Sequence, residues 1–393
     1  MSLFEKCRQF TEARQAQAAG YYPYFIPIQD ADATAVVIDG KQKVMIGSNN
    51  YLGLTHHPKV IEAAEQALKK YGSGCTGSRY LNGTLALHEE LEAKLADFLH
   101  MEAALVFSTG FQTNLGIISA LVGDGDAVFI DRLDHASIVD GCRLSYGETI
   151  RFRHNDIDDL ERAVVEVGPE KGKLIAVDGI YSMDGDIADI PGILSIAQEY
   201  GCQLMIDDAH SIGVLGENGR GTAEHFGVED QVDLIMITFS KSLASIGGMV
   251  AGDEDVIHYI KHYARSMIFS ASAPPSSVAT VIAALEVIQE EPERQENLWR
   301  NTRKMKREFN RLGFDTGKSE TPVIPIIVRD VMKTAFLWRR LFDEGVFTNV
   351  AISPAVPVGS ERLRTSYMAT HTDEQLDFVL DRFEKIGKEL RII

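Results

Sequence analysis

The sequence predicts an α/β protein whose larger domain is built on a mostly parallel sheet. From residue 104 onward, short apolar runs alternate with amphipathic stretches of helical length. The runs are too short for buried helices and end in polar or glycine-rich segments, which is typical of strands covered on both faces. The expected strands are residues 104–107, 127–130, 174–177, 204–206, 234–237 and 249–251.

The overall charge is strongly acidic. Lys and Arg number 39 against 57 Asp and Glu, which gives a net charge of −18 and disfavours nucleic acid and anionic membrane as primary partners. The 4 cysteines lie far apart with no C-x-x-C pair, which is typical of a reducing compartment. No apolar run reaches the about 18 residues of a membrane span. We therefore expect a cytoplasmic protein, and leave open a peripheral contact with the inner face of the membrane.

The 393 residues are enough for more than one domain. Residues 1–46 are expected to form a surface helix over 3–19 and an aromatic-rich arm over 21–27 that packs on the body or on a partner subunit. Residues 47–289 are expected to form the large domain, and a charged break at 290–294 begins a smaller α+β domain over 290–393. Its expected strands are 322–328 and 361–366, and its main helices 331–344 and 372–388.

A lysine just beyond one buried run is the candidate nucleophile. Lys241 follows the expected strand 234–237, and ligands bind at the carboxyl ends of the strands in such sheets. An amine that is partly desolvated there has a lowered pKa and can form a Schiff base. Thr238 and Ser240 offer hydroxyl groups to a phosphate beside it. The alternative is a surface lysine after an edge strand.

Other polar residues follow neighbouring strands. Gly110 precedes a helix expected from Asn114 to about residue 121, and the free N–H groups of a helix start favour a phosphate. His135 is either a histidine that caps a helix or an imidazole that stacks on a flat ring. Asp207 and His210 place an acid and an imidazole close together, but a metal site needs more ligands than this pair, so we expect none.

Together these groups match the needs of pyridoxal 5′-phosphate (PLP). An amine nucleophile, a phosphate cradle and a carboxylate facing a ring nitrogen are the groups that this cofactor requires. Asp207 is expected to keep the pyridine nitrogen protonated, His210 to donate toward the phenolic oxygen and His135 to stack on the ring.

Five motifs resemble those of the α-oxoamine synthases, in the right order and over essentially the whole chain. They are SNNYLGL (48–54), STGFQTN (108–114), DDAHSIG (207–213), TFSK (238–241) and RLRT with THT (362–365 and 370–372). The resemblance implies a fold-type I PLP-dependent transferase that condenses an amino acid with an acyl-CoA and releases CO₂. It also implies a homodimer with shared active sites.

The resemblance implies a role for each site residue. Lys241 would carry PLP and act in catalysis with His135, Asp207 and His210. Asn49 and Arg364 would bind the substrate, with Arg364 on its carboxylate. The remaining cofactor contacts would come from Gly110, Phe111, Ser182, Thr238, Ser240 and, on the partner subunit's phosphate, Ser272.

Within the family, residues 22–27, 72–84 and 364–372 are most similar to bacterial members that join L-serine to palmitoyl-CoA, the first step of sphingolipid synthesis. Ile26 departs from the basic residue expected in several relatives. The alternatives are a sibling synthase that uses glycine with acetyl-CoA, alanine with pimeloyl-CoA, or an acyl-carrier protein; a PLP aminotransferase; and a non-catalytic partner subunit.

Overall fold

The computed structural model describes residues 2–393, which form two compact units. One unit comprises residues 49–298, and the other combines the described residues up to 48 with residues 299–393. The boundary falls within helix α13 (Glu293–Leu312). The expected domains 1–46, 47–289 and 290–393 stay a prediction, since a compact unit is not by itself an independently folding one.

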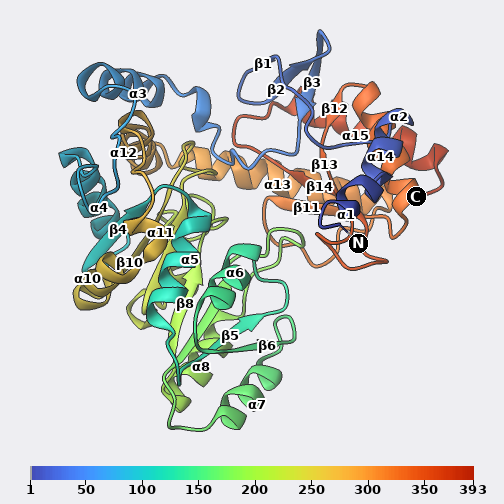
Figure 1. The fold of residues 1–393 in the computed structure, drawn as a ribbon. Coiled ribbons are helices and arrows are strands. Elements are labelled where there is room, and N and C mark those ends of the chain that lie inside the picture. The colour runs from blue at the N-terminus through green and yellow to red at the C-terminus, as the bar shows by residue number, and fades with distance from the viewer. Residues whose placement is uncertain (1) are drawn as a thin grey trace. The chain divides into compact units, whose positions relative to one another are not determined.

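The unit of residues 49–298 contains the large sheet. Over the described residues this sheet has seven strands in the order β4-β10-β9-β8-β7-β5-β6 (Figure 1). Strand β10 is antiparallel to both of its neighbours, and the other neighbouring pairs are parallel. The mostly parallel sheet is therefore confirmed. The strands are β4 (Ala103–Phe107), β5 (Ala127–Asp131), β6 (Glu148–Phe152), β7 (Lys173–Asp178), β8 (Gln203–Asp207), β9 (Leu234–Thr238) and β10 (Gly248–Gly252).

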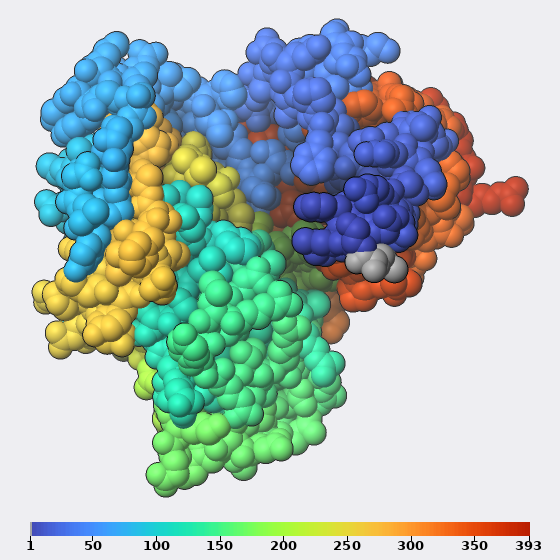
Figure 2. Space-filling model, in the orientation of Figure 1, coloured from blue at the N-terminus to red at the C-terminus, as the bar shows by residue number. Residues whose placement is uncertain are grey.

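Helices cover both faces of this sheet. Strands β5, β7, β9 and β10 are buried at every residue, which requires cover on each side. In Figure 2 the light-blue surface of α3 and α4 adjoins the gold surface of the region that contains α12. The helices are α3 (Pro58–Tyr71), α4 (Ala86–Phe98), α5 (Gly110–Leu121), α6 (Ala136–Leu144), α7 (Ile157–Val167), α8 (Ile190–Tyr200), α9 (Thr222–Phe226), α10 (Glu254–Tyr263), α11 (Arg265–Ile268) and α12 (Pro275–Glu290), with 3₁₀ turns at Leu54–His56 and Glu229–Gln231.

All six strands expected in the large sheet are present. Strand β6 was not predicted, because it is an edge strand whose residues are mostly exposed and do not form an apolar run. The helix expected from Asn114 starts earlier, at Gly110, so that part of the prediction was wrong. The reason is a side-chain cap: Thr109 Oγ1 accepts a hydrogen bond from the Gln112 backbone N–H at 3.1 Å.

The other unit holds two small sheets. Their strand orders are β1-β2-β3-β12 and β11-β14-β13. The strands are β1 (Asp30–Ala31), β2 (Ala35–Ile38), β3 (Lys41–Met45), β11 (Val323–Ile327), β12 (Val346–Phe347), β13 (Asn349–Ala351) and β14 (Arg362–Ser366). The helices besides α13 are α1 (Glu5–Gln9), α2 (Glu12–Ala18), α14 (Val331–Asp343) and α15 (Asp373–Glu389).

The single helix expected over residues 3–19 is instead two short ones. Phe10 adopts an extended backbone with ψ of 93°, which ends α1 before α2 begins. Within residues 2–393, no helix is both long and apolar enough to cross a membrane.

Three phenylalanines form the centre of the smaller unit's core. The Phe383 ring lies 5.0 Å from that of Phe309 and 5.7 Å from that of Phe314, in edge-to-face geometry. All three are buried, and they join α13 and α15 to the chain between α13 and β11. Edge-to-face pairs add to the stabilisation that burial supplies.

Replacing Phe383 with Ala is expected to destabilise this unit by about 3–5 kcal/mol, because it leaves a cavity between two helices. Chemical denaturation followed by circular dichroism measures the shift. The control is Val331→Ala, whose side chain is about half exposed and whose expected change is within about 0.5 kcal/mol. Equal shifts for the two variants would contradict the assignment of Phe383 to the core.

Candidate functional site

A cavity of about 330 Å³ lies at the carboxyl edge of the large sheet. Strands β4, β5, β7, β8 and β9 all end at this edge, and the segments that follow them supply its wall. Most of the predicted site residues line it. They are Gly110, Phe111, His135, Ser182, Asp207, His210, Thr238, Ser240 and Lys241.

Three predicted residues lie outside the lining. The Asn49 Oδ1 atom is 3.4 Å from the Tyr51 hydroxyl, which is in turn 2.7 Å from Nδ1 of His210. Ser272 is held by its backbone N–H, which donates to the Gly77 carbonyl at 2.9 Å. Arg364 is buried in β14 of the other unit. Their functional roles stay predictions.

The start of α5 forms a cradle suited to an anion. Thr109 caps this helix, and Gly110 and Phe111 are its first residues, so their backbone N–H groups lack partners within the helix. A Cβ atom on Gly110 would lie 2.6 Å from Thr238 Oγ1, so only glycine lets the helix approach β9 this closely. Thr238 Oγ1 is 3.0 Å from Ser240 Oγ, which adds two hydroxyls to the same wall.

Lys241 is half-buried at the mouth of the sheet, three residues beyond the end of β9. Its backbone is held by a turn in which the Ala244 N–H donates to the Lys241 carbonyl at 2.9 Å. The Ser245 N–H donates to the Phe239 carbonyl at 2.9 Å and closes the same loop. These bonds fix the position from which the lysine side chain joins the pocket.

Asp207 is a buried carboxylate at the end of β8. Its Oδ2 atom accepts a hydrogen bond from Asn114 Nδ2 at 2.7 Å, and its Oδ1 atom accepts one from the Ala209 N–H at 3.0 Å. A buried carboxylate held by donors in this way is a fitting partner for a protonated ring nitrogen. The lysine, the carboxylate and the narrow anion cradle in one cavity fit PLP.

The structure confirms that His135 is a capping histidine, and its stacking on a ring stays a prediction. It is the N-cap of α6, where its Nδ1 atom accepts the Ser137 backbone N–H at 3.2 Å, and it also lines the pocket. The Phe111 ring stands edge-on to it at 6.3 Å. Partial burial lowers the pKa of His135, and the charge of Lys241 acts in the same direction while that of Asp207 opposes it.

Sequence reasoning missed a second acid in the wall. Asp178 ends β7 and lines the cavity, and its Oδ2 atom accepts the His135 backbone N–H at 3.0 Å. Asp134 Oδ1 accepts the Asp178 N–H at 2.9 Å. Burial raises the pKa of both carboxyls well above the usual range. The charge of Asp178 adds to this for Asp134, and the charge of Asp207 adds to it for Asp178. The rule that selected Asp207, an acid directly after a buried run, also selects Asp178.

A histidine between two carboxylates supports the same loops. His154 Nδ1 lies 3.1 Å from Asp131, and its Nε2 lies 2.7 Å from Asp186. The Tyr181 hydroxyl donates to Asp131 at 3.1 Å. Burial alone would lower the pKa of His154, but the hydrogen bonds to Asp131 and Asp186 outweigh it and raise this pKa to about 10.

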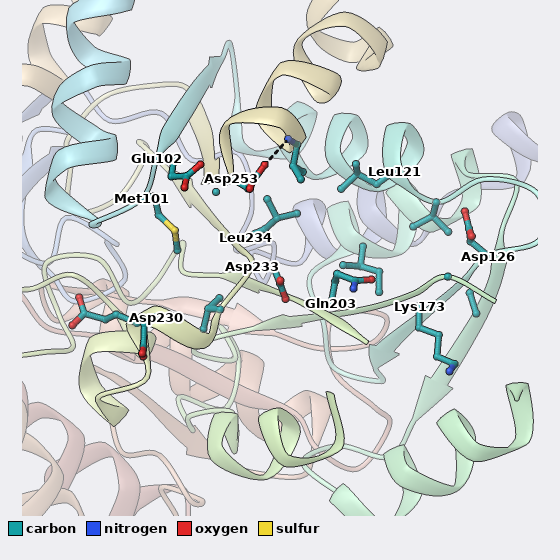
Figure 3. A pocket seen from close by; sticks show the side chains of 18 of the residues that line it. Met101, Glu102, Leu121, Asp126, Lys173, Gln203, Asp230, Asp233, Leu234 and Asp253 are labelled. Atoms are coloured by element: carbon teal, nitrogen blue, oxygen red, sulfur yellow. Dashed lines mark hydrogen bonds between the residues drawn. The ribbon is translucent and has the colours of Figure 1, made fainter. Parts of the chain in front are cut away.

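A larger cavity, of about 530 Å³, lies at the opposite edge of the sheet. Ala127, Lys173, Gln203 and Leu234, which begin β5, β7, β8 and β9, contribute to its lining. Figure 3 shows acidic side chains around it, including those of Glu102, Asp126, Asp230, Asp233 and Asp253. It contains none of the predicted site residues. Among residues 2–393, no group of three or more His, Cys, Asp or Glu side chains is placed to hold a metal.

The fold and the lysine-containing pocket define a PLP-dependent enzyme of fold type I. Residues 41–383 match the aminotransferase class I and II family. The chain belongs to the α-oxoamine synthase group of this family, which confirms the resemblance seen in its motifs.

Individual relatives match over nearly their full length. The serine palmitoyltransferase of Sphingobacterium spiritivorum is 52% identical, with 99% of this chain and 98% of the relative covered. The 8-amino-7-oxononanoate synthase of Symbiobacterium thermophilum is 46% identical, with coverage of 97% and 98%. The solved structure of Sphingomonas wittichii serine palmitoyltransferase is 37% identical, with a TM-score of 0.97 and 100% of each chain covered.

Replacing Gly110 with Ala is expected to weaken PLP binding about 5- to 150-fold, because overpacking costs about 1–3 kcal/mol and the new Cβ atom would clash with Thr238 in the wall of the cradle. Titration of the Gly110→Ala protein with PLP, followed by absorbance, measures this affinity. Gly123→Ala is the control, since its Cβ would lie 3.4 Å from the tip of a flexible side chain. Equal PLP affinities in the two variants would rule out the narrow cradle.

His154 is expected to stabilise the fold in a pH-dependent way. Its pKa is raised from an ordinary 6.5 to about 10, so its contribution is complete below about pH 6.5 and is lost as the pH rises toward 10. The difference in thermal midpoint between the wild type and His154→Gln should therefore shrink from pH 6.5 to 10.

The control for this experiment is His100→Gln, because His100 is exposed and its nearest acidic atom, on Glu229, is 3.8 Å away. Its midpoint should differ little from that of the wild type at either pH. A His154→Gln deficit that stays constant over this range would contradict the raised pKa.

Proposed function

We propose that the chain joins L-serine to palmitoyl-CoA and releases CoA, CO₂ and 3-oxosphinganine, the first step of sphingolipid synthesis. The observation that carries this proposal is the 52% identity to a serine palmitoyltransferase over 99% of the chain. The pocket supports the chemistry, because it places an amine, a buried carboxylate and an anion cradle around one cavity.

The proposed roles follow from the chemistry of each side chain. When bound, PLP supplies a ring that accepts negative charge from the Cα atom of the amino acid. Lys241 Nζ removes the proton from Cα of serine. Asp207 binds the ring nitrogen, and His210 donates toward the phenolic oxygen. Gly110, Phe111, Thr238 and Ser240 hold the phosphate, with Ser182 as a further hydroxyl and Ser272 reaching the partner subunit's phosphate.

Three further side chains bind the substrate in this proposal. His135 and Arg364 bind the serine carboxylate, and Asn49 faces the same substrate. A bond forms between Cα of serine and the thioester carbonyl carbon, and CoA leaves. The carboxylate then leaves as CO₂, and Cα regains a proton.

A homodimer is part of the proposal. Large apolar side chains are exposed on two loops that the Ser272-to-Gly77 hydrogen bond ties together. The exposed fractions are 79% for Leu81, 73% for Phe269 and 55% for Tyr80. Such a group of apolar side chains is typical of an interface. We also propose a cytoplasmic location, with contact at the inner face of the membrane where the lipid-like substrate collects.

The second candidate is a sibling synthase. Its support is the 46% identity to an 8-amino-7-oxononanoate synthase over 97% of the chain. Such an enzyme would use alanine with pimeloyl-CoA, and a related one would use glycine with acetyl-CoA. An aminotransferase on the same fold would transfer nitrogen and release no CoA.

One assay separates these functions. CoA release is measured with serine, glycine or alanine against acetyl-, pimeloyl- or palmitoyl-CoA, after the cofactor absorbance of the purified protein has been recorded. Release with serine and palmitoyl-CoA alone is the expected result. Preference for alanine with pimeloyl-CoA, or for glycine with acetyl-CoA, would show that the proposed substrates are wrong while the proposed class of reaction stands.

Replacing Lys241 with Ala is expected to abolish the absorbance of covalently held cofactor and to reduce CoA release to background, because no other amine is assigned to the proton transfer. The matched control is Lys69→Ala on the surface of α3, where the side chain is 67% exposed. A Lys241→Ala enzyme with a near-normal rate would contradict the assignment.

A further inference from the structure

We propose that Asn114 and Ser137 are positioning residues that hold His135 as the neutral tautomer with its proton on Nε2. This inference rests on the proposed function, because it concerns how His135 serves the pocket. It assigns a task to two buried side chains that the reaction itself does not use.

Asn114 links the carboxylate side of the pocket to the histidine side. It is fully buried in α5, and its Nδ2 atom donates to Asp207 Oδ2 at 2.7 Å and to Ser137 Oγ at 2.8 Å. A carboxylate has only acceptors, so the NH₂ group and not the carbonyl must face Asp207. Both N–H bonds of the amide are therefore committed, one to each neighbour.

Because Asn114 donates to Ser137, the Ser137 hydroxyl must in turn donate to His135. Its oxygen accepts from Asn114, which leaves its own O–H to donate to His135 Nδ1 at 2.7 Å. The backbone N–H of Ser137 points at the same nitrogen at 3.2 Å, and a backbone N–H can only donate. Two donors thus converge on Nδ1, so this nitrogen carries a lone pair and the ring proton sits on Nε2.

The same geometry disfavours the charged ring. An imidazolium has N–H groups at both nitrogens, so its Nδ1–H would face the two Ser137 donors with no acceptor between them. The charged and titratable groups around His135 are Asp207 on β8, Lys241 after β9, Asp178 on β7 and His210. Burial and Lys241 lower the pKa of His135, and Asp207 opposes them without reversing the direction.

Close packing of two helices makes this contact possible. A Cβ atom on Gly141 of α6 would lie 2.9 Å from the Asn114 carbonyl oxygen of α5. Glycine at this position lets α6 approach α5 closely enough for Ser137 to reach the Asn114 amide. The neutral His135 ring then offers an N–H donor in the wall of a pocket proposed to receive a carboxylate.

The first test is Asn114→Asp. The new carboxylate cannot donate to Asp207 or Ser137, and it would draw the Ser137 O–H away from Nδ1 of His135. The added negative charge should raise the pKa of His135, so the acid limb of the kcat/KM profile moves to higher pH. At pH 7 kcat/KM should fall about 10- to 100-fold, the range for lost hydrogen bonds to charged groups.

The second readout does not depend on turnover. In full-length protein labelled with ¹⁵N-histidine, with and without PLP, the His135 ring signals are assigned by their loss in His135→Gln. The wild type should show an unprotonated Nδ1 and a protonated Nε2. In Asn114→Asp this pattern should shift toward the doubly protonated ring at the same pH. An unchanged pattern in a folded variant would overturn the proposal.

Ser137→Ala provides a graded comparison. The backbone N–H at position 137 still donates to Nδ1, so the tautomer should be retained while kcat/KM falls about two- to tenfold. The control is Ser119→Ala on α5, the helix that contains Asn114, because the Ser119 hydroxyl bonds to the Leu115 carbonyl of its own helix. A tautomer change in Ser137→Ala as large as that in Asn114→Asp would show that the backbone donor does not hold the ring.

The test of the His135 tautomer can fail or succeed independently of the test of the proposed function. If the wild type releases CoA with a different pair of substrates, the kinetic comparison is repeated with that pair. The ring-nitrogen signals are read in the same way in either case. A protonated Nδ1 in the wild type refutes this inference even if serine and palmitoyl-CoA are the substrates.

Discussion

The buried carboxylate of Asp207 is the group on which much of this site depends. Removing an ion from water costs several kcal/mol unless hydrogen bonds replace the lost solvent. The backbone of Ala209 supplies one donor from its own loop, and Asn114 supplies the other from a neighbouring helix. The second donor requires α5 to lie against the carboxyl end of β8. The close packing of α5 on β9, and of α6 on α5, is consistent with that need.

Glycines mark where this packing is tightest. Gly110 lets the start of α5 reach Thr238, and Gly141 lets α6 reach α5. Each position would bring a side chain under 3.0 Å from a neighbouring atom. The cradle proposed for the phosphate and the proposed support of His135 therefore share one structural feature, a helix that lies closer to its neighbour than alanine would allow.

The sequence predicted the fold where a strong local pattern exists and missed it where tertiary contacts decide. The buried strands of the large sheet are apolar runs with polar ends, so their order and location were predictable. The edge strand β6 has no such run, and the start of α5 looks like a loop because Gly110 and Thr109 are poor helix residues in isolation. Most of the pocket residues follow strands and were found by that rule. The link between Asn114 and Ser137 was not predictable, because it depends on the distance between two helices.

The capping role of His135 bears on how mutational data on this enzyme are read. A capping side chain typically contributes about 1 kcal/mol to the helix that it begins. Removing the imidazole therefore takes away a pocket wall and also frees the Ser137 N–H at the start of α6. A rate measured on His135→Ala would combine the two losses and overstate the contribution of the imidazole ring to catalysis. Asparagine, which caps helices well and has no imidazole, isolates the chemical contribution.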